Sequence, residues 1–160
     1  MQALVGANLI DGTGRPVLHD ATVLIDGDRL DAVGPRGAVN IPPDADVVDI
    51  SGMTVLPGLI DCHDHLASRN YDLAGRWGLT EPASLRHLRV AKTLEQTLAS
   101  GYTCVRDAAW LDVGFKQAVE EGLIPGPRLV ISVVIISPTG GLSDHVCPAG
   151  HRRPFHVDPL

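Results

Sequence analysis

The pattern of apolar residues changes near position 56, and this change restricts the chain to few architectures. Residues 1–56 read as short strands joined by tight turns, with a hairpin signal at Asp26-Gly27-Asp28 and no helical periodicity. After position 56, segments typical of strands alternate with segments typical of amphipathic helices, in the order β-α-β-α-β. The sequence therefore predicts an α/β protein: a small antiparallel β unit, then a parallel sheet or a (β/α)₈ barrel.

Residue ranges can be given for the elements of the second part. Apolar residues from Leu85 to Leu98 recur at steps of three or four, which predicts a helix. Asp112 is placed to cap a second helix, and Gly122 to end it. The expected strands are 54–60, 102–106 and 129–136, the last being continuously apolar, as is typical of a parallel strand covered on both faces.

Composition limits the classes of function. The 160 residues are 44% hydrophobic and 20% charged, as in soluble globular proteins. No apolar run approaches the roughly 20 residues of a membrane span, and the first residues lack the basic region of a signal peptide. A net charge of −6 argues against nucleic acid as a partner. Three widely spaced cysteines predict no disulfide framework, so we expect a cytoplasmic protein that binds neither nucleic acid nor membrane.

His63 and His65 lie two residues apart at the expected end of the first parallel strand. Because a strand repeats its side-chain direction every two residues, both imidazoles should point the same way, with Cα atoms about 6.6 Å apart. Two ring nitrogens could then bind one ion at roughly 2.1 Å each. Asp61 shares this parity, and we expect it to accept a hydrogen bond from a ligand imidazole or to support the strand end. A pair of surface histidines is the alternative, but the apolar strand before the pair favours a metal site.

A second group of metal-binding residue types lies near the end of the chain. His145, Cys147, His151 and His156 could form a separate zinc site. Structural zinc sites usually show more tightly paired ligands, however, and we favour an active-site loop for this segment.

Several motifs together resemble the amidohydrolase superfamily. The stretch from Leu56 to His65, LPGLIDCHDH, is similar to its PGxIDxHxH signature. Residues 103–107, 115–122, 126–129 and 137–141 resemble the imidazolonepropionase-like and Xaa-Pro dipeptidase (prolidase-like) branch. The resemblance covers nearly the whole chain and corresponds to the N-terminal portion of the family fold.

The resemblance implies an architecture for both parts. Residues 1–56 would form a small β-sandwich domain that strands returning from the C-terminus complete. Residues 57–160 would supply the first three β/α units of a metal-dependent (β/α)₈ TIM barrel. The remainder of its own barrel would then be a partner of this chain, and the complete protein is expected to be a homo-oligomer.

The resemblance also implies a metal centre. His63 and His65 would bind the more buried of one or two divalent ions, with Zn²⁺ expected. A bridging carboxylated lysine, two further histidines and a general-base aspartate are expected beyond residue 160. The metal would activate water for hydrolysis of an amide C–N bond in a dipeptide, an N-acyl amino acid or a similar small molecule. Without those groups, the 160-residue chain alone is expected to be inactive.

The substrate is less restricted by the sequence. Arg69 and Tyr71, after the first strand, and His145, after the glycine pair, are candidate substrate contacts, although each also reads as an ordinary loop residue. Arg106-Asp107 is interpreted as a structural pair. The family often has a histidine directly after the glycine pair, where this chain has Leu142. A deaminase or cyclic-amide hydrolase of the same superfamily therefore stays open, as does a non-catalytic metal-binding or assembly module.

Overall fold

A computed structural model describes residues 1–67 and 82–138. The candidate residues Arg69, Tyr71 and His145, and the histidine- and cysteine-containing segment 145–156, lie outside the described residues. Internal contacts divide the chain into two compact units, Met1–Pro57 and Gly58–Leu160. This division falls one residue after the expected boundary.

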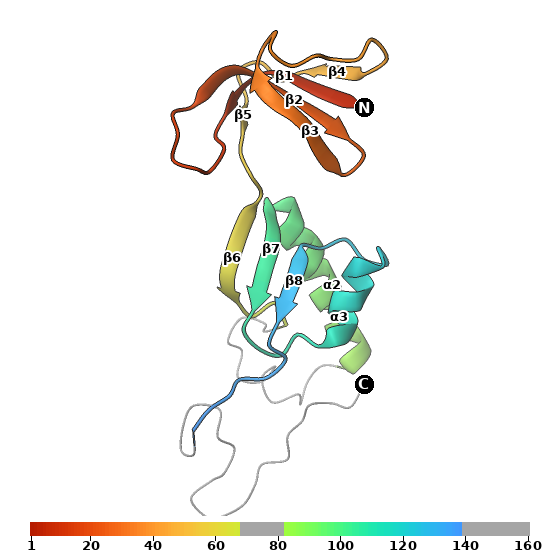
Figure 1. The fold of residues 1–160 in the computed structure, drawn as a ribbon. Coiled ribbons are helices and arrows are strands. Elements are labelled where there is room, and N and C mark those ends of the chain that lie inside the picture. Colours follow the sequence, from red (N-terminus) through yellow and green to blue (C-terminus); the bar gives the residue numbers. More distant parts are fainter. Residues whose placement is uncertain (68–81, 139–160) are drawn as a thin grey trace, which may run out of the picture. The chain divides into compact units, whose positions relative to one another are not determined.

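The first unit contains a mixed five-stranded sheet (Figure 1). Its strands are β1 (Gln2–Leu9), β2 (Leu18–Asp26), β3 (Arg29–Pro35), β4 (Asp46–Asp49) and β5 (Thr54–Val55). The order is β3-β2-β1-β4, and β5 also pairs with β1. The β1–β2 and β2–β3 pairs are antiparallel as predicted, but β4 and β5 both run parallel to β1, so the purely antiparallel prediction is wrong. The described residues of this unit form one sheet, without the second sheet of a sandwich.

Alternation along β1 builds the core of the first unit. Ala3 and Val5 are buried and pack with Leu24 of β2, and the segment after β3 adds Val39 and Ile41. The hairpin between β2 and β3 turns at Gly27, whose φ of +58° is accessible to glycine without steric cost. The predicted hairpin is therefore confirmed, together with the turn residue that allows it.

The second unit is a parallel three-stranded sheet with two helices on one side (Figure 1). Its elements are β6 (Leu59–Asp64), α2 (Ala83–Ala99), β7 (Tyr102–Asp107), α3 (Val113–Glu120) and β8 (Arg128–Ile131). The sheet order β6-β7-β8 follows the chain, and both strand pairs are parallel. Val90 and Leu94 of α2 pack on Val105 of β7 and Leu129 of β8. The β-α-β-α-β order predicted from the apolar pattern is confirmed for these residues.

Two of the predicted strands differ in the structure. The segment 54–60 is divided between the units: β5 pairs with β1, and β6 begins only at Leu59. Pro57, which has no backbone N–H and cannot donate to a ladder, lies between them. The apolar run 129–136 is a strand only as far as Ile131, because Val133 has a φ of +62° and the Val134 amide donates to the Ser132 carbonyl at 2.6 Å. A tight turn therefore ends β8 despite its apolar sequence.

The two helices agree with the sequence to different extents. Asp112 caps α3 by accepting a 2.6 Å hydrogen bond from the Gly114 amide, as predicted. In α2, Val90 and Leu94 are buried, whereas Leu88, expected on the apolar face, is exposed. No helix among the described residues is long and apolar enough to cross a membrane.

Candidate metal centre

The two histidines of the H-x-H pair lie beside each other at the carboxyl end of β6. Their ring centroids are 5.2 Å apart and their planes are inclined at 81°. Nδ1 of His65 is buried and has no hydrogen-bond partner among the described residues. Leaving a buried polar atom unsatisfied costs about 1–3 kcal/mol, and such an atom in a native structure calls for an explanation.

These residues fit a metal ion in part. Two imidazoles at this separation can offer two nitrogen donors to one ion. Nδ1 of His65 is not engaged by any group within residues 1–67 and 82–138. However, no group of three metal-binding side chains occurs within residues 1–67 and 82–138. Because catalytic zinc sites have at least three protein ligands, any such centre would need ligands from outside these residues.

Asp61 does not have the partner expected for it. Its Oδ1 atom accepts a 2.9 Å hydrogen bond from the backbone amide of His63, and neither imidazole donates to it in the described part of the chain. In the sheet register Asp61 is opposite Val105, which is buried beneath the helices. The β6–β7 pairing shifts between Asp61 and Asp64, so simple alternation does not hold through the H-x-H segment. Of the two expected roles for Asp61, the structure shows local support of the strand end.

Asp107 is the buried carboxylate beside the histidine pair, and the sequence pattern did not single it out for this site. It is fully buried at the end of β7. Its Oδ2 atom accepts a 2.6 Å hydrogen bond from the Leu66 amide, and its Oδ1 atom accepts from the amides of Ala109 at 3.1 Å and Leu111 at 3.3 Å. It therefore joins the segment that follows His65 to the turn after β7. An aspartate at the end of the strand next to the H-x-H strand is the signal that could have identified it.

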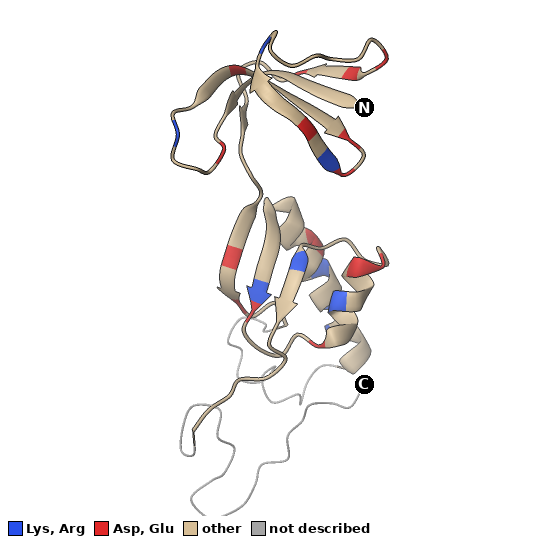
Figure 2. Cartoon of the chain, viewed as in Figure 1, with Lys and Arg blue, Asp and Glu red and all other residues tan. Residues whose placement is uncertain are grey.

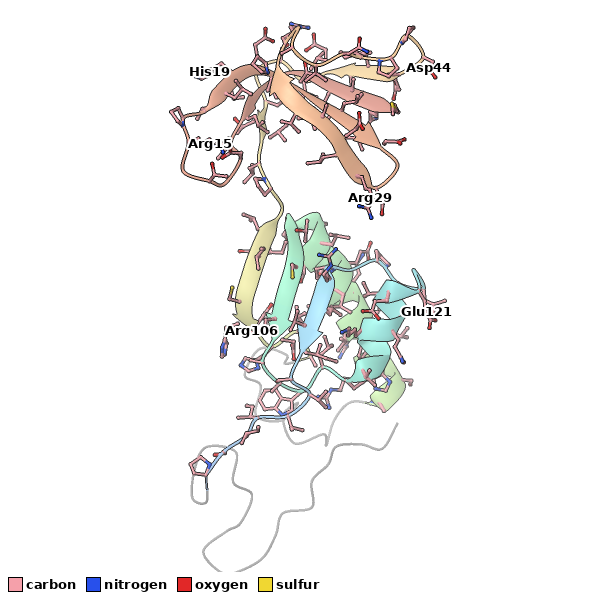
Figure 3. All side chains as sticks on the ribbon, in the orientation of Figure 1. Arg15, His19, Arg29, Asp44, Arg106 and Glu121 are labelled. Carbon is pink, nitrogen blue, oxygen red and sulfur yellow. The ribbon has the colours of Figure 1, made fainter. Side chains whose placement is uncertain are left out.

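The interpretation of Arg106 and Asp107 as structural residues holds, but the two are not paired with each other. Adjacent strand residues point to opposite faces, and Arg106 Nε instead donates to the Cys62 carbonyl of the neighbouring strand at 2.5 Å. Figure 3 shows Arg106 at the ends of β6 and β7. Figure 2 shows acidic and basic residues interspersed along this sheet rather than gathered by sign.

The surroundings of Asp107 alter its acidity. Desolvation by burial raises the pKa of its carboxyl group above the ordinary value of 3.8. The hydrogen bonds from the three backbone amides and the proximity of His65 lower the pKa, but they offset the burial only in part. The buried carboxyl group is therefore harder to ionise than a solvated aspartate.

Trp110 is a second residue of this site that the sequence did not indicate. Its ring centroid lies 5.4 Å from that of His65, with the planes inclined at 37°. Its backbone has a φ of +70°, and its amide donates a 2.9 Å hydrogen bond to the carbonyl of Val133, whose φ is +62°. Bulky residues in this region of φ are rare and cost of order 1–3 kcal/mol each, and such residues often cluster at functional sites. The turns after β7 and β8 are therefore both strained, and the first carries an indole to His65.

Comparison with known proteins identifies a family and several related chains. Residues 54–157 match the model of the Amidohydrolase family. An imidazolonepropionase of Idiomarina loihiensis is 40% identical over 60 residues, which cover 38% of this chain and 15% of that protein. An ochratoxinase of Aspergillus niger is 30% identical over 151 residues, covering 89% of this chain and 30% of that protein. The crystal structure of a prolidase complexed with N-methylphosphonate-L-proline matches with a TM-score of 0.81 and 37% identity, covering 96% of this chain and 37% of the other. The chain thus spans less than two fifths of the length of each of these proteins.

Proposed function

Because the chain belongs to the amidohydrolase family, in its imidazolonepropionase- and prolidase-like branch, we propose that it contributes part of the active site of a metal-dependent hydrolase of amide C–N bonds. The observation that carries this proposal is the His63–His65 pair, with ring centroids 5.2 Å apart at the carboxyl end of a parallel strand. Catalytic groups collect at that end of the strands in barrel enzymes.

The proposed metal ligands in this chain are His63 and His65, and the proposed ion is Zn²⁺. Members of the family generally bind divalent metals, and the unsatisfied Nδ1 of His65 supports a missing ligand at this place. A bound ion would supply a Lewis acid and an activated water. The protein's own contribution is to hold the two imidazoles together. Asp107 does so on one side, through the Leu66 amide.

The proposed architecture extends the same argument. We place β6, β7 and β8 as the first three strands of a (β/α)₈ barrel, with the rest of the barrel as the partner that supplies the bridging lysine, further histidines and general-base aspartate. The proposed substrates are dipeptides and N-acyl amino acids. The prolidase crystallised with a proline-bearing phosphonate supports this substrate class. Assembly of the complete protein as a homo-oligomer and a cytoplasmic location stay predictions.

Binding of Co²⁺ tests the metal site without relying on activity. The ring of Trp110 lies 5.4 Å from that of His65, so a paramagnetic ion on the pair should quench the part of the tryptophan fluorescence that Trp110→Phe removes. His63→Ala and His65→Ala should each abolish the quenching. His19→Ala, on β2 of the other unit, is the matched control and should leave it unchanged. Quenching that persists without His63 would contradict the proposed site.

Hydrolysis tests the proposed reaction. The full-length protein should release the amine from dipeptides or N-acyl amino acids, lose this activity with a chelator, and regain it with Zn²⁺. If the ion binds but no amide in such a panel is cleaved, the metal site stands and the proposed reaction does not.

A further inference from the structure

We propose that Trp110 is a specificity-determining residue whose indole contacts an aromatic group next to the scissile amide of the substrate. This inference rests on the proposed function, since it takes the His63–His65 pair as the place where the amide is held. It goes further because it assigns the recognition of a planar apolar ring in the substrate to Trp110.

The position of the indole is the first argument. Its ring lies against the ring of His65, and 47% of the residue remains exposed. A tryptophan that served only to fill a core would bury most of its large apolar surface. Among the described residues, the indole keeps a free surface directly beside a proposed metal ligand. A substrate ring that packed on the indole would place the adjacent amide of the substrate near the histidine pair.

The backbone of Trp110 is the second argument. Its φ of +70° is one that glycine adopts without steric cost, whereas a bulky side chain does so only with strain. The conformation by itself therefore does not call for a tryptophan. The strain of this conformation is borne by a residue whose side chain contacts His65. We take this as an argument that the indole has a function there.

The turn that carries Trp110 is held from several sides. The amides of its two neighbours, Ala109 and Leu111, both donate to the buried carboxylate of Asp107, and its own amide donates to Val133. Every backbone amide from 109 to 111 is therefore hydrogen-bonded within the second unit. A side chain on such a turn is ordered before a substrate arrives, which is the property required of a residue that selects substrates.

The exposed surface of the Trp110 indole indicates the chemical class of its contact. Indole presents an apolar face that stacks with planar rings, and aromatic pairs gain free energy beyond the area they bury. In the described part of the chain, the ring contact of Trp110 is with His65. A planar aromatic group, which gains stacking as well as burial on such a face, is therefore the class we assign to this contact.

Binding measured by NMR tests this inference independently of turnover. In the ¹⁵N-labelled full-length protein, the indole N–H signal that disappears in Trp110→Phe is assigned to Trp110. Titration with N-benzoylglycine should shift this signal, and N-acetylglycine at equal concentration should not. Equal shifts from both compounds, a shift from neither, or a shift only from a cationic amine would overturn the proposal, whether or not the protein hydrolyses amides.

Kinetics provide the second readout. The ratio of kcat/KM for N-benzoyl and N-acetyl forms of one amino acid should fall about tenfold in Trp110→Ala and be largely retained in Trp110→Phe. The ratio of kcat/KM for substrates that release phenylalanine or alanine tests whether the aromatic group lies on the amine side of the scissile bond instead. Trp110→Phe removes the fluorescence reporter, so its Co²⁺ binding is measured by calorimetry. Unchanged binding shows that this variant is folded at the histidine pair. An unaltered ratio for both substrate pairs in a folded Trp110→Ala would refute the assignment, while leaving the metal site in place.

Discussion

The carboxylate of Asp107 accepts a 2.6 Å hydrogen bond from the backbone amide of Leu66, the residue directly after His65. This bond connects the carboxyl ends of β6 and β7, and the other carboxylate oxygen holds the turn that carries Trp110. One buried side chain therefore holds both the backbone directly after His65 and the turn that places Trp110 against it. The position of the proposed metal ligand depends on a residue 42 positions later in the chain, as well as on its own strand.

We predict that Asp107→Asn weakens both the fold and the metal site. An amide has one acceptor oxygen where the carboxylate has two, so its NH₂ group would face a backbone donor in a buried site. The free energy of unfolding should fall by about 1–3 kcal/mol, and Co²⁺ affinity should fall about 10–100-fold, as for other groups that orient metal ligands. Urea denaturation and Co²⁺ titration measure the two effects.

Asp61→Asn is the matched control for this prediction. Asp61 makes an exposed hydrogen bond to the His63 amide through one oxygen, which asparagine retains. Its effect on the free energy of unfolding should stay within about 0.5 kcal/mol. Wild-type affinity for Co²⁺ in Asp107→Asn, or a larger loss in Asp61→Asn, would mean that Asp107 does not position His65.

The raised pKa of Asp107 predicts the sign of one contribution to stability. Below pH 3.8 the carboxyl group is protonated in both the folded and the unfolded state. Above 3.8 the unfolded chain ionises first, so the free energy of unfolding falls as pH rises through the folded-state pKa, and then becomes level. Asp11 and Asp49, whose pKa values are lowered by hydrogen bonds from Thr13 and Ser51, contribute in the opposite direction.

The contribution of Asp107 is therefore measured as a difference in the free energy of unfolding between two proteins. The free energy of unfolding of the wild type minus that of Asp107→Asn should decrease between pH 3 and pH 7, because Asp11 and Asp49 are common to both proteins. A difference that increases with pH would show that Asp107 is stabilised as the carboxylate, against the direction given by its burial.

Gly58→Ala is expected to destabilise the second unit. A Cβ atom on Gly58 would lie 2.6 Å from the Cβ atom of Thr103, closer than real contacts allow. Overpacking of this kind costs about 1–3 kcal/mol. Thermal unfolding followed by circular dichroism should show the loss. In a double-mutant cycle, Thr103→Gly should recover part of it, because it removes the opposing side chain. If the losses of stability in Gly58→Ala and Thr103→Gly are strictly additive, the cost of Gly58→Ala does not come from the contact with Thr103.

The parts of the fold that depend on neighbouring residues were predictable. The Asp26-Gly27-Asp28 hairpin, the Asp112 cap and the alternation of strands and helices each follow from local residue preferences. The parallel partners of β1 were not predictable. β4 pairs with β1 from some 40 residues away, and local residue preferences do not indicate which strand it pairs with. The end of β8 was missed for another reason. The apolar run continues through Val133, and only the backbone of the turn shows that the strand has stopped.

The histidine pair was predictable because two histidines two residues apart at the end of an apolar strand form a local pattern. Strand parity itself does not hold there, since the β6–β7 pairing shifts between Asp61 and Asp64. Asp107 and Trp110 were not singled out for this site. An aspartate at the end of the strand next to the H-x-H strand is a signal that could have identified Asp107, whereas the positive φ of Trp110 leaves no pattern in the residue types. For Asp61, support of the strand end, one of its two expected roles, is what the structure shows.

We predict that the 160-residue chain by itself hydrolyses no amide. The two histidines fall short of a catalytic zinc shell, and no further metal-binding group joins them in the described residues. Dipeptides and N-acyl amino acids should stay at background rates with added Zn²⁺. Turnover by the pure chain that disappears on His63→Ala would show that this chain holds more of the catalytic groups than the structure places at the pair.

The last prediction concerns association of the 160-residue chain. Ile60 and Val130 are 67% and 50% exposed, and the sheet register places them on the face opposite Val105 and Leu129, which the helices cover.

In the described residues, β6 and β8 each have one edge without a neighbouring strand. Apolar faces and open strand edges promote pairing with other chains, and three strands cannot close a barrel of eight. We therefore expect the isolated chain to self-associate, and to become monodisperse when the rest of the barrel is supplied. Size-exclusion chromatography with light scattering measures both. Ile60→Glu, on the exposed face, should reduce association more than Val47→Glu, an exposed apolar residue of β4 in the other unit. A stable 17.0 kDa monomer with cooperative thermal unfolding would refute this prediction and weaken the placement of β6, β7 and β8 in a barrel.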